Sequence, residues 1–146
     1  MTNEFIHIFG RDLNKLSEEI GLYHDEQSLW IVKGNISNSA GNLCLHLVGN
    51  LNHFIGATLG NTGYIRTRDV EFSSKNIPRK EMLRAIEETI YTVENTLSKL
   101  SEADLEKDFP LEKHGDKLST KAMLLHLVAH LSYHIGQINY HRRLVE

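Results

Sequence analysis

Apolar residues recur at intervals of three and four along most of the chain, the spacing that gives an amphipathic helix its buried face. Four long stretches show this pattern: residues 3–20, 38–59, 78–100 and 119–143. Residue types that begin and end helices stand at suitable places, with Pro78 and Ser119 at two starts and Gly21 and Gly60 at two ends. The pattern therefore predicts an all-α protein, organised as a four-helix bundle.

The segments between these helices are predicted to be non-helical for the most part. Residues 22–37 lack a helical period and should contain a short extended piece in which Trp30 covers the core. Residues 60–78 hold turn formers and charged residues, and a connection this long can cross over a bundle. A capping box at 101–104 predicts a short extra turn, and a loop is expected over 107–118. Because such connections permit crossovers, the spacing alone leaves the up-and-down order of the helices open.

Length and composition indicate one globular domain spanning residues 1–146. Hydrophobic residues make up 40% of the chain and charged residues 24%, which is typical of a protein that buries a core. The net charge is −3 without a basic stripe, so a nucleic acid is not expected as a partner. No apolar run approaches the roughly 20 residues of a membrane span, and charge comes too early for a signal peptide. A single cysteine excludes an intramolecular disulfide, and together these features predict a reducing, cytoplasmic location.

Histidine is the one compositional oddity. The chain has nine, and three of them, His126, His130 and His134, recur every fourth residue on the last predicted helix. Neighbours in such a series lie about 6 Å apart along the helix axis, so a pair can bind one metal ion. His126 and His134 are about 12 Å apart, too far to share an ion, and His130 therefore belongs to either possible pair. A third ligand must come from elsewhere, and His46 on the second predicted helix can supply it.

Spacing alone leaves two interpretations of these histidines open: metal ligands, or core residues whose ring nitrogens find other partners. A zincin-type protease is excluded because no glutamate stands inside the His-x-x-x-His pairs. His53 lies two turns from His46, so the two cannot share an ion. Cys44 points away from the His46 face and is interpreted as a small core residue. No P-loop, glycine fingerprint or Ser-His-Asp pattern is found.

Three motifs resemble the DinB-like superfamily of metal-binding four-helix bundles, which includes the YfiT-like proteins. They are NLCLHLVGNL on the second helix, RTRDVEF at 66–72 and HLVAHLSYHIGQI on the last helix. The resemblance implies a divalent metal ion bound by His46, His130 and His134, with further coordination positions left to water or substrate. We expect zinc, with nickel, iron or manganese as alternatives. The resemblance also implies a homodimer and an up-down-down-up bundle, with 60–78 as the long crossover between helices two and three.

The chain departs from the usual residues of this superfamily beside one matched ligand. Many DinB-like proteins carry His-His-Arg-Gly-Gln where this chain has the segment from Tyr133 to Gln137. The ligand position is kept, and the neighbouring histidine and arginine are absent. The candidates for contacts around the metal or with a substrate are His126, Tyr133, Gln137 and Asn50. No catalytic residue is assigned.

Characterised DinB-like proteins are mostly thiol-dependent transferases or isomerases that use bacillithiol, mycothiol or glutathione. The resemblance therefore implies a metal-dependent enzyme, similar to a thiol S-transferase, that acts on a small electrophile with a low-molecular-weight thiol. The alternative is a metal-binding or stress-related structural dimer without catalysis. An open coordination position beside a cleft would favour the enzyme, and a closed, buried site would favour the alternative.

Overall fold

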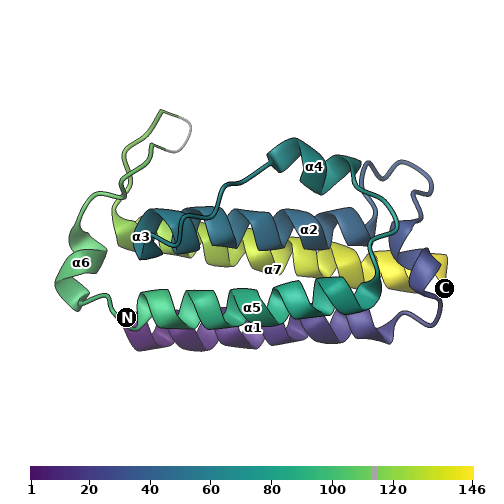
Figure 1. Cartoon of the computed structure of the whole chain (residues 1–146), viewed down its shortest axis with the longest axis horizontal. Coiled ribbons are helices and arrows are strands. Elements are labelled where there is room, and N and C mark those ends of the chain that lie inside the picture. The colour runs from purple at the N-terminus through teal and green to yellow at the C-terminus, as the bar shows by residue number, and fades with distance from the viewer. Residues whose placement is uncertain (113–114) are drawn as a thin grey trace.

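The computed structural model describes residues 1–112 and 115–146, and the chain is helical over most of these residues (Figure 1). The elements in chain order are α1 (Thr2–Leu22), η1 (Glu26–Trp30), α2 (Ala40–Leu51), η2 (Asn52–Ala57), α3 (Thr58–Gly60), α4 (Arg68–Ser73), α5 (Arg79–Leu97), α6 (Glu102–Glu106) and α7 (Thr120–Val145). No strand occurs among the described residues, so the all-α class is confirmed. Residues 113 and 114, part of the loop expected over 107–118, lie outside the described residues.

Four long helices, α1, α2, α5 and α7, lie side by side (Figure 1). Helix α1 packs against α5 and α7, and α2 packs against the same two helices. After α3 the chain returns along α2 to the opposite end of the molecule, where α5 begins (Figure 1). This returning segment carries α4, which packs on α2. The arrangement leaves α2 between α4 on the outside and α7 on the inside.

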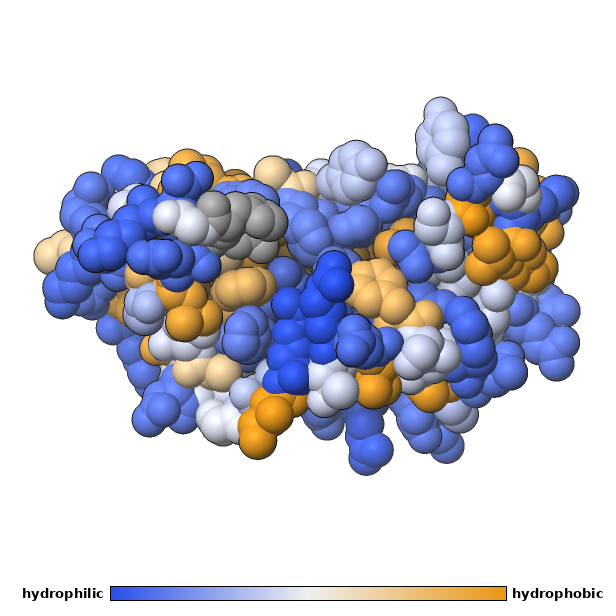
Figure 2. Space-filling view, turned by 90° about the horizontal axis from the view of Figure 1, so that it is seen from above, coloured by the Kyte–Doolittle hydropathy of each residue, from blue (hydrophilic) through white to orange (hydrophobic). Residues whose placement is uncertain are grey.

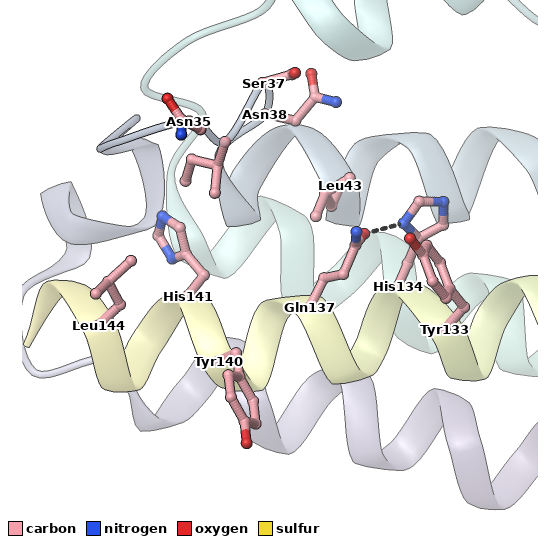
Figure 3. A pocket seen from close by; sticks show the side chains of 11 residues that line it. Asn35, Ser37, Asn38, Leu43, Tyr133, His134, Gln137, Tyr140, His141 and Leu144 are labelled. Atoms are coloured by element: carbon pink, nitrogen blue, oxygen red, sulfur yellow. Dashed lines mark hydrogen bonds between the residues drawn. The ribbon is translucent and has the colours of Figure 1, made fainter.

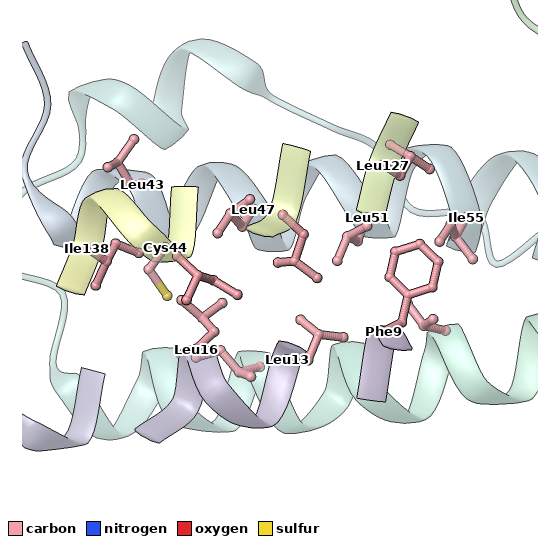
Figure 4. Packing of buried hydrophobic residues seen from close by; sticks show 14 of the residues in the cluster. Phe9, Leu13, Leu16, Leu43, Cys44, Leu47, Leu51, Ile55, Leu127 and Ile138 are labelled. Atoms are coloured by element: carbon pink, nitrogen blue, oxygen red, sulfur yellow. The ribbon is translucent and has the colours of Figure 1, made fainter. Parts of the chain in front are cut away.

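The core lies where the apolar faces of the long helices meet (Figure 4). Its side chains recur with helical spacing, as the sequence pattern predicts, and many are fully buried: Phe9, Leu13, Leu16, Leu47, Leu51, Ile55, Met82, Ile86, Leu127 and Leu131. Cys44 belongs to this cluster, and burial raises the pKa of its thiol to about 12. A thiol held protonated in this way behaves as a small apolar residue, the role expected for Cys44.

Helix starts follow the capping signals in the sequence. The Ser119 hydroxyl accepts a hydrogen bond from the backbone N–H of Ala122, and α6 opens with the expected capping box between Ser101 and Asp104. These bonds satisfy backbone N–H groups that have no partner within the helix. Gly21, expected to end the first helix, lies inside α1.

Three local features differ from the sequence expectations. The extended piece expected around Trp30 is instead the short 3-10 helix η1, and a helix, α4, lies inside the 60–78 connection. Both are under two turns long, too short to produce a hydrophobic period. The second long helix also changes to a π-helical turn at Asn52–Ala57. There the Asn52 amide donates to the Val48 carbonyl and to Thr89 of α5, an interaction that periodicity does not reveal.

No helix in the described part of the chain combines the length and apolar character needed to cross a membrane. The face seen from the side of α4 is largely hydrophilic, with apolar residues in separate patches (Figure 2).

The contact between Trp30 and Gly41 offers a test of the packing. A methyl group added at Gly41 would lie 2.7 Å from the indole ring of Trp30, closer than atoms can pack. We expect Gly41→Ala to displace the indole, to lower the free energy of unfolding by about 1–3 kcal/mol and to shift the emission of the single tryptophan to longer wavelength. Urea denaturation followed by tryptophan fluorescence measures both effects.

Gly10→Ala is the matched control, because Gly10 also lies within a long helix, and a methyl group added there would have no atom of another element within 4 Å. It should raise the free energy of unfolding by about 0.5–1 kcal/mol through helix propensity. Equal stability and emission for the two variants would contradict the packing of Trp30 on α2.

Candidate metal centre

Three histidines from two helices converge at the interface of α2 and α7. The Nε2 atoms of His46 and His130 are 3.1 Å apart. The ring centroid of His134 lies 4.6 Å from that of His130 and 5.3 Å from that of His46. Each residue offers one nitrogen, and these nitrogens all lie within 4.8 Å of one another. His46 is buried, and His130 and His134 are half-buried.

The packing of the core brings these residues together. His46 precedes Leu47 on α2, and His130 precedes Leu131 on α7; both leucines are fully buried. Because α2 and α7 pack through such apolar side chains, the neighbouring faces that carry the histidines meet at the edge of the core. His134 lies one helical turn beyond His130, on the same side of α7.

Glu71 of α4 fixes the tautomer of His46. Its Oε1 atom lies 3.1 Å from Nδ1 of His46, and an ionised carboxylate can only accept, so Nδ1–H donates. The Nε2 lone pair of His46 is then directed toward His130 and His134. A carboxylate behind a histidine is the usual support for a metal-binding imidazole, because it orients the ring and increases its basicity.

Arg66 keeps Glu71 ionised. Its Nε and Nη2 atoms donate to the two carboxylate oxygens, each at 2.9 Å. Burial alone would raise the pKa of Glu71, but the hydrogen bonds from His46 and Arg66, with the charge of Arg66, lower it below its ordinary value. Nη2 of Arg66 also lies 3.3 Å from Nδ1 of His46; two donors cannot bond each other, so the guanidinium is assigned to Glu71.

Helix α4 is itself held in place on α2. The side-chain amide of Asn42 donates to the backbone carbonyls of Glu71 and Ser74. Gly49 leaves the space that the Glu71 carboxylate occupies, because a Cβ atom at this position would collide with it. The position of Glu71 behind His46 is therefore determined by several contacts.

His134 has a comparable support from its own helix. Its Nδ1 atom lies 2.6 Å from Oε1 of Gln137, so Nδ1–H donates to the amide oxygen and Nε2 keeps its lone pair. Burial lowers the pKa of His134, and the bond to Gln137 opposes this shift only in part. The imidazole is therefore neutral near pH 7, the state in which histidine binds a metal ion.

The donor set fits a divalent metal ion. Two nitrogens bound to one tetrahedral zinc ion at about 2.0–2.1 Å lie about 3.3 Å apart, close to the 3.1 Å between Nε2 of His46 and Nε2 of His130. Three imidazole nitrogens suit zinc, nickel and iron, and leave at least one coordination position for another ligand. The cluster of His46, His130 and His134 is thus one that could hold a metal ion.

The other histidines and polar residues considered in the sequence analysis lie outside the three-histidine cluster. His126, a candidate for contacts around the metal, is exposed, and its ring is stacked on that of His130 with the two centroids 6.4 Å apart. Tyr133 is exposed, and its ring lies 5.3 Å from that of His134. Asn50 is buried one turn after His46, and its Oδ1 atom has no hydrogen-bond partner among the described residues. His53 lies in the π-helical turn, outside the three-histidine group.

A cavity of about 670 Å³ adjoins the histidine cluster (Figure 3). Tyr133, His134 and Gln137 line it together with residues of the segment before α2. In Figure 3, His134 and Gln137 extend from α7 toward α2. Two of the residues expected to contact a substrate, Tyr133 and Gln137, therefore lie at a cavity wall.

The sequence interpretation missed the roles of Arg66 and Glu71. Both lie in the motif RTRDVEF, which supported the resemblance but received no function. Because α4 was not predicted, its residues could not be placed against α2. The available signals were a charged pair five residues apart in a long connection and a glycine, Gly49, one turn after His46.

Replacement of Glu71 tests its role behind His46. Glu71→Gln removes the charge that Arg66 binds and places an amide where two donors need acceptors. We expect metal affinity to fall about 10–100-fold with the binding stoichiometry kept. Competition with a colorimetric chelator measures the affinity. Asp69→Asn, an exposed change on the same helix, is the control and should leave the affinity unchanged; equal losses in both variants would rule out a specific role for Glu71.

Metal affinity should also depend on pH. A protonated imidazole cannot bind a metal ion, and free histidine titrates near pH 6.5. Since the pKa of His134 is lowered, its own protonation occurs at lower pH. We therefore expect affinity to be constant above about pH 7 and to fall as the pH drops through about 6. The same chelator competition, repeated between about pH 8 and pH 5, measures this; a flat profile would mean that the ligands are not histidines.

Comparison with known proteins places the chain in a family. No curated protein matches it. The family model described as "Protein of unknown function (DUF1572)" matches residues 7–146, a range that includes all three histidines of the cluster as well as Arg66 and Glu71. The chain belongs to the DUF1572 family of proteins of unknown function.

Proposed function

We propose that this protein is a divalent-metal-dependent enzyme of the DinB-like superfamily that joins a small thiol, through its sulfur, to an electrophile. The observation that carries the proposal is the convergence of His46, His130 and His134, whose nitrogens lie within 4.8 Å of one another. These are the residues that the resemblance implies as metal ligands. They come from two helices that are distant in the sequence, and core packing alone does not require three imidazoles at one point.

Two further observations support membership of the superfamily. The three resembling motifs meet in space, because RTRDVEF supplies Arg66 and Glu71 behind His46. The long helices lie side by side, and the segment after α3 returns along α2 (Figure 1). We infer an up-down-down-up four-helix bundle that forms a single domain over residues 1–146, with 60–78 as the crossover.

A bound divalent cation would act as a Lewis acid and make a thiol acidic enough to ionise near pH 7. The residues of the chain would hold and orient that cation: His46, His130 and His134 through their Nε2 atoms, with Glu71 and Gln137 fixing two of the rings. Zinc is the first candidate, with nickel, iron or manganese as alternatives.

In the proposed reaction the thiol loses its proton to solvent and its sulfur forms a bond to an electrophilic carbon. A leaving group then departs with the electron pair of the broken bond. No residue of the chain is assigned as a proton donor or acceptor. The cavity beside His134 supports this enzyme over a non-catalytic metal-binding protein, because it gives a small molecule access to the cluster.

Conjugation activity tests the proposal. Metal-loaded protein should join a low-molecular-weight thiol to a generic electrophile such as 1-chloro-2,4-dinitrobenzene, followed by absorbance of the thioether. Bacillithiol, mycothiol, glutathione and coenzyme A should be compared as thiols. Chelation should remove the activity and addition of zinc should restore it. Equal rates with and without metal, or no rate with any thiol, would leave the non-catalytic interpretation.

The homodimer implied by the resemblance is a separate prediction. Exposed apolar side chains, such as Leu22 of α1 and Tyr91 of α5, are available for such a contact. We expect sedimentation equilibrium at micromolar concentration to give twice the chain mass of 16.7 kDa. A mass of one chain would remove the dimer and leave the metal site unaffected.

A further inference from the structure

The cavity beside His134 has a wall without formal charge. Its volume is about 670 Å³, within the range of sites that bind small molecules. Apolar surface comes from Ile36, Leu43 and Leu144, and no Asp, Glu, Lys or Arg is among the lining residues. Polar groups come from amides and a hydroxyl of the segment before α2 and from Gln137 of α7 (Figure 3). The wall therefore offers apolar contact and neutral hydrogen-bonding groups.

The ring nitrogens of the two histidines in the wall are engaged with other groups of the chain. Nδ1 of His134 donates to Oε1 of Gln137 at 2.6 Å, and its Nε2 belongs to the metal cluster. His141 is buried, and both ring nitrogens are engaged: Nε2 with the Ile31 carbonyl at 2.8 Å and Nδ1 with the Tyr23 hydroxyl at 2.7 Å. A molecule in the cavity would therefore contact the ring faces or edges of these histidines, because both nitrogens of His141 already have partners.

Three arginines near the cavity and the cluster are engaged elsewhere. Arg66 is bonded to Glu71, and Arg142 donates to the buried Glu19. Arg143 packs on the ring of Tyr140 at 5.0 Å and is not among the lining residues. In Figure 3 the Tyr140 ring points away from the other labelled side chains. A carboxylate placed in the cavity would lose water without gaining an ion pair with a Lys or Arg of the lining residues, and its transfer is costly for that reason.

We propose that this cavity binds the uncharged, aromatic or branched apolar part of the electrophile. Its wall favours such a group, and His134 belongs both to the wall and to the metal cluster, so the bound molecule lies next to the metal position. The identity of the reaction rests on the proposed function above, whereas binding in the cavity does not require the metal. The carboxylate-bearing part of a small thiol is excluded from this cavity.

A matched pair of probes tests the preference. 2-Naphthamide and 2-naphthoate have the same ring system and differ in charge. We expect metal-free and zinc-loaded protein to bind 2-naphthamide at least about tenfold more tightly than 2-naphthoate, a difference of about 1.4 kcal/mol. Ligand-observed NMR titration at about pH 7.5, where 2-naphthoate is ionised and 2-naphthamide is uncharged, gives both dissociation constants.

A positive charge added to the wall should weaken the preference for 2-naphthamide over 2-naphthoate. Leu144 lines the cavity and is 53% exposed, so Leu144→Lys can be made without disturbing the core. An exposed ion pair contributes up to about 1 kcal/mol, so the tenfold ratio should narrow by about threefold. Leu125→Lys is the control: Leu125 is 52% exposed on the same helix, and is not among the lining residues. It should leave the ratio unchanged.

The outcomes separate this proposal from the proposed function. Equal affinity for the two probes, or equal effects of the two lysine variants, would overturn the binding preference whether or not the protein conjugates thiols. Preferential binding of 2-naphthamide that responds only to Leu144→Lys would support it. If that preference holds while conjugation never depends on metal, the cavity assignment stands and the proposed reaction fails.

Discussion

The packing of α2 against α7 is the interaction on which the site depends. Buried leucines of the two helices, such as Leu47 and Leu131, determine how closely the helices approach. His46 and His130 precede these leucines, so the same packing brings their Nε2 atoms to 3.1 Å. Neutral imidazoles with directed lone pairs are what a divalent cation requires. The hydrophobic core and the candidate metal site are therefore two consequences of one helix interface.

The ion pair of Glu71 and Arg66 adds orientation to this arrangement. A buried carboxylate alone would destabilise the fold, but here it accepts bonds from His46 and Arg66. Helix α4 positions Glu71 beside His46. The side-chain amide of Asn42 on α2 holds the end of α4 by donating to two backbone carbonyls there. The crossover segment thus contributes to the site although it carries none of the three histidines. On the other side of the cluster, Gln137 orients His134 at the wall of the cavity.

The parts predictable from sequence were those governed by periodicity. The long helices and the buried apolar faces follow from the three- and four-residue spacing, and helical geometry limited the histidine pair on α7 to two choices. The spacing could not choose between His126 and His134, and the choice of His134 came from the resemblance. Glu71 could not be predicted because its contact with His46 depends on α4, a six-residue helix with no hydrophobic period. The cavity depends on how the segment before α2 folds back toward α7, which no local pattern encodes.

The central claim is that His46, His130 and His134 bind one divalent metal ion. Elemental analysis of protein purified without a histidine tag, after incubation with zinc and removal of excess metal, tests it most directly. We expect about one ion per chain in the wild type and in the His53→Ala and His126→Ala variants, and none in the His46→Ala, His130→Ala and His134→Ala variants. Metal that is lost with His126→Ala but kept with His134→Ala, or a wild-type protein that retains no metal, would contradict the claim.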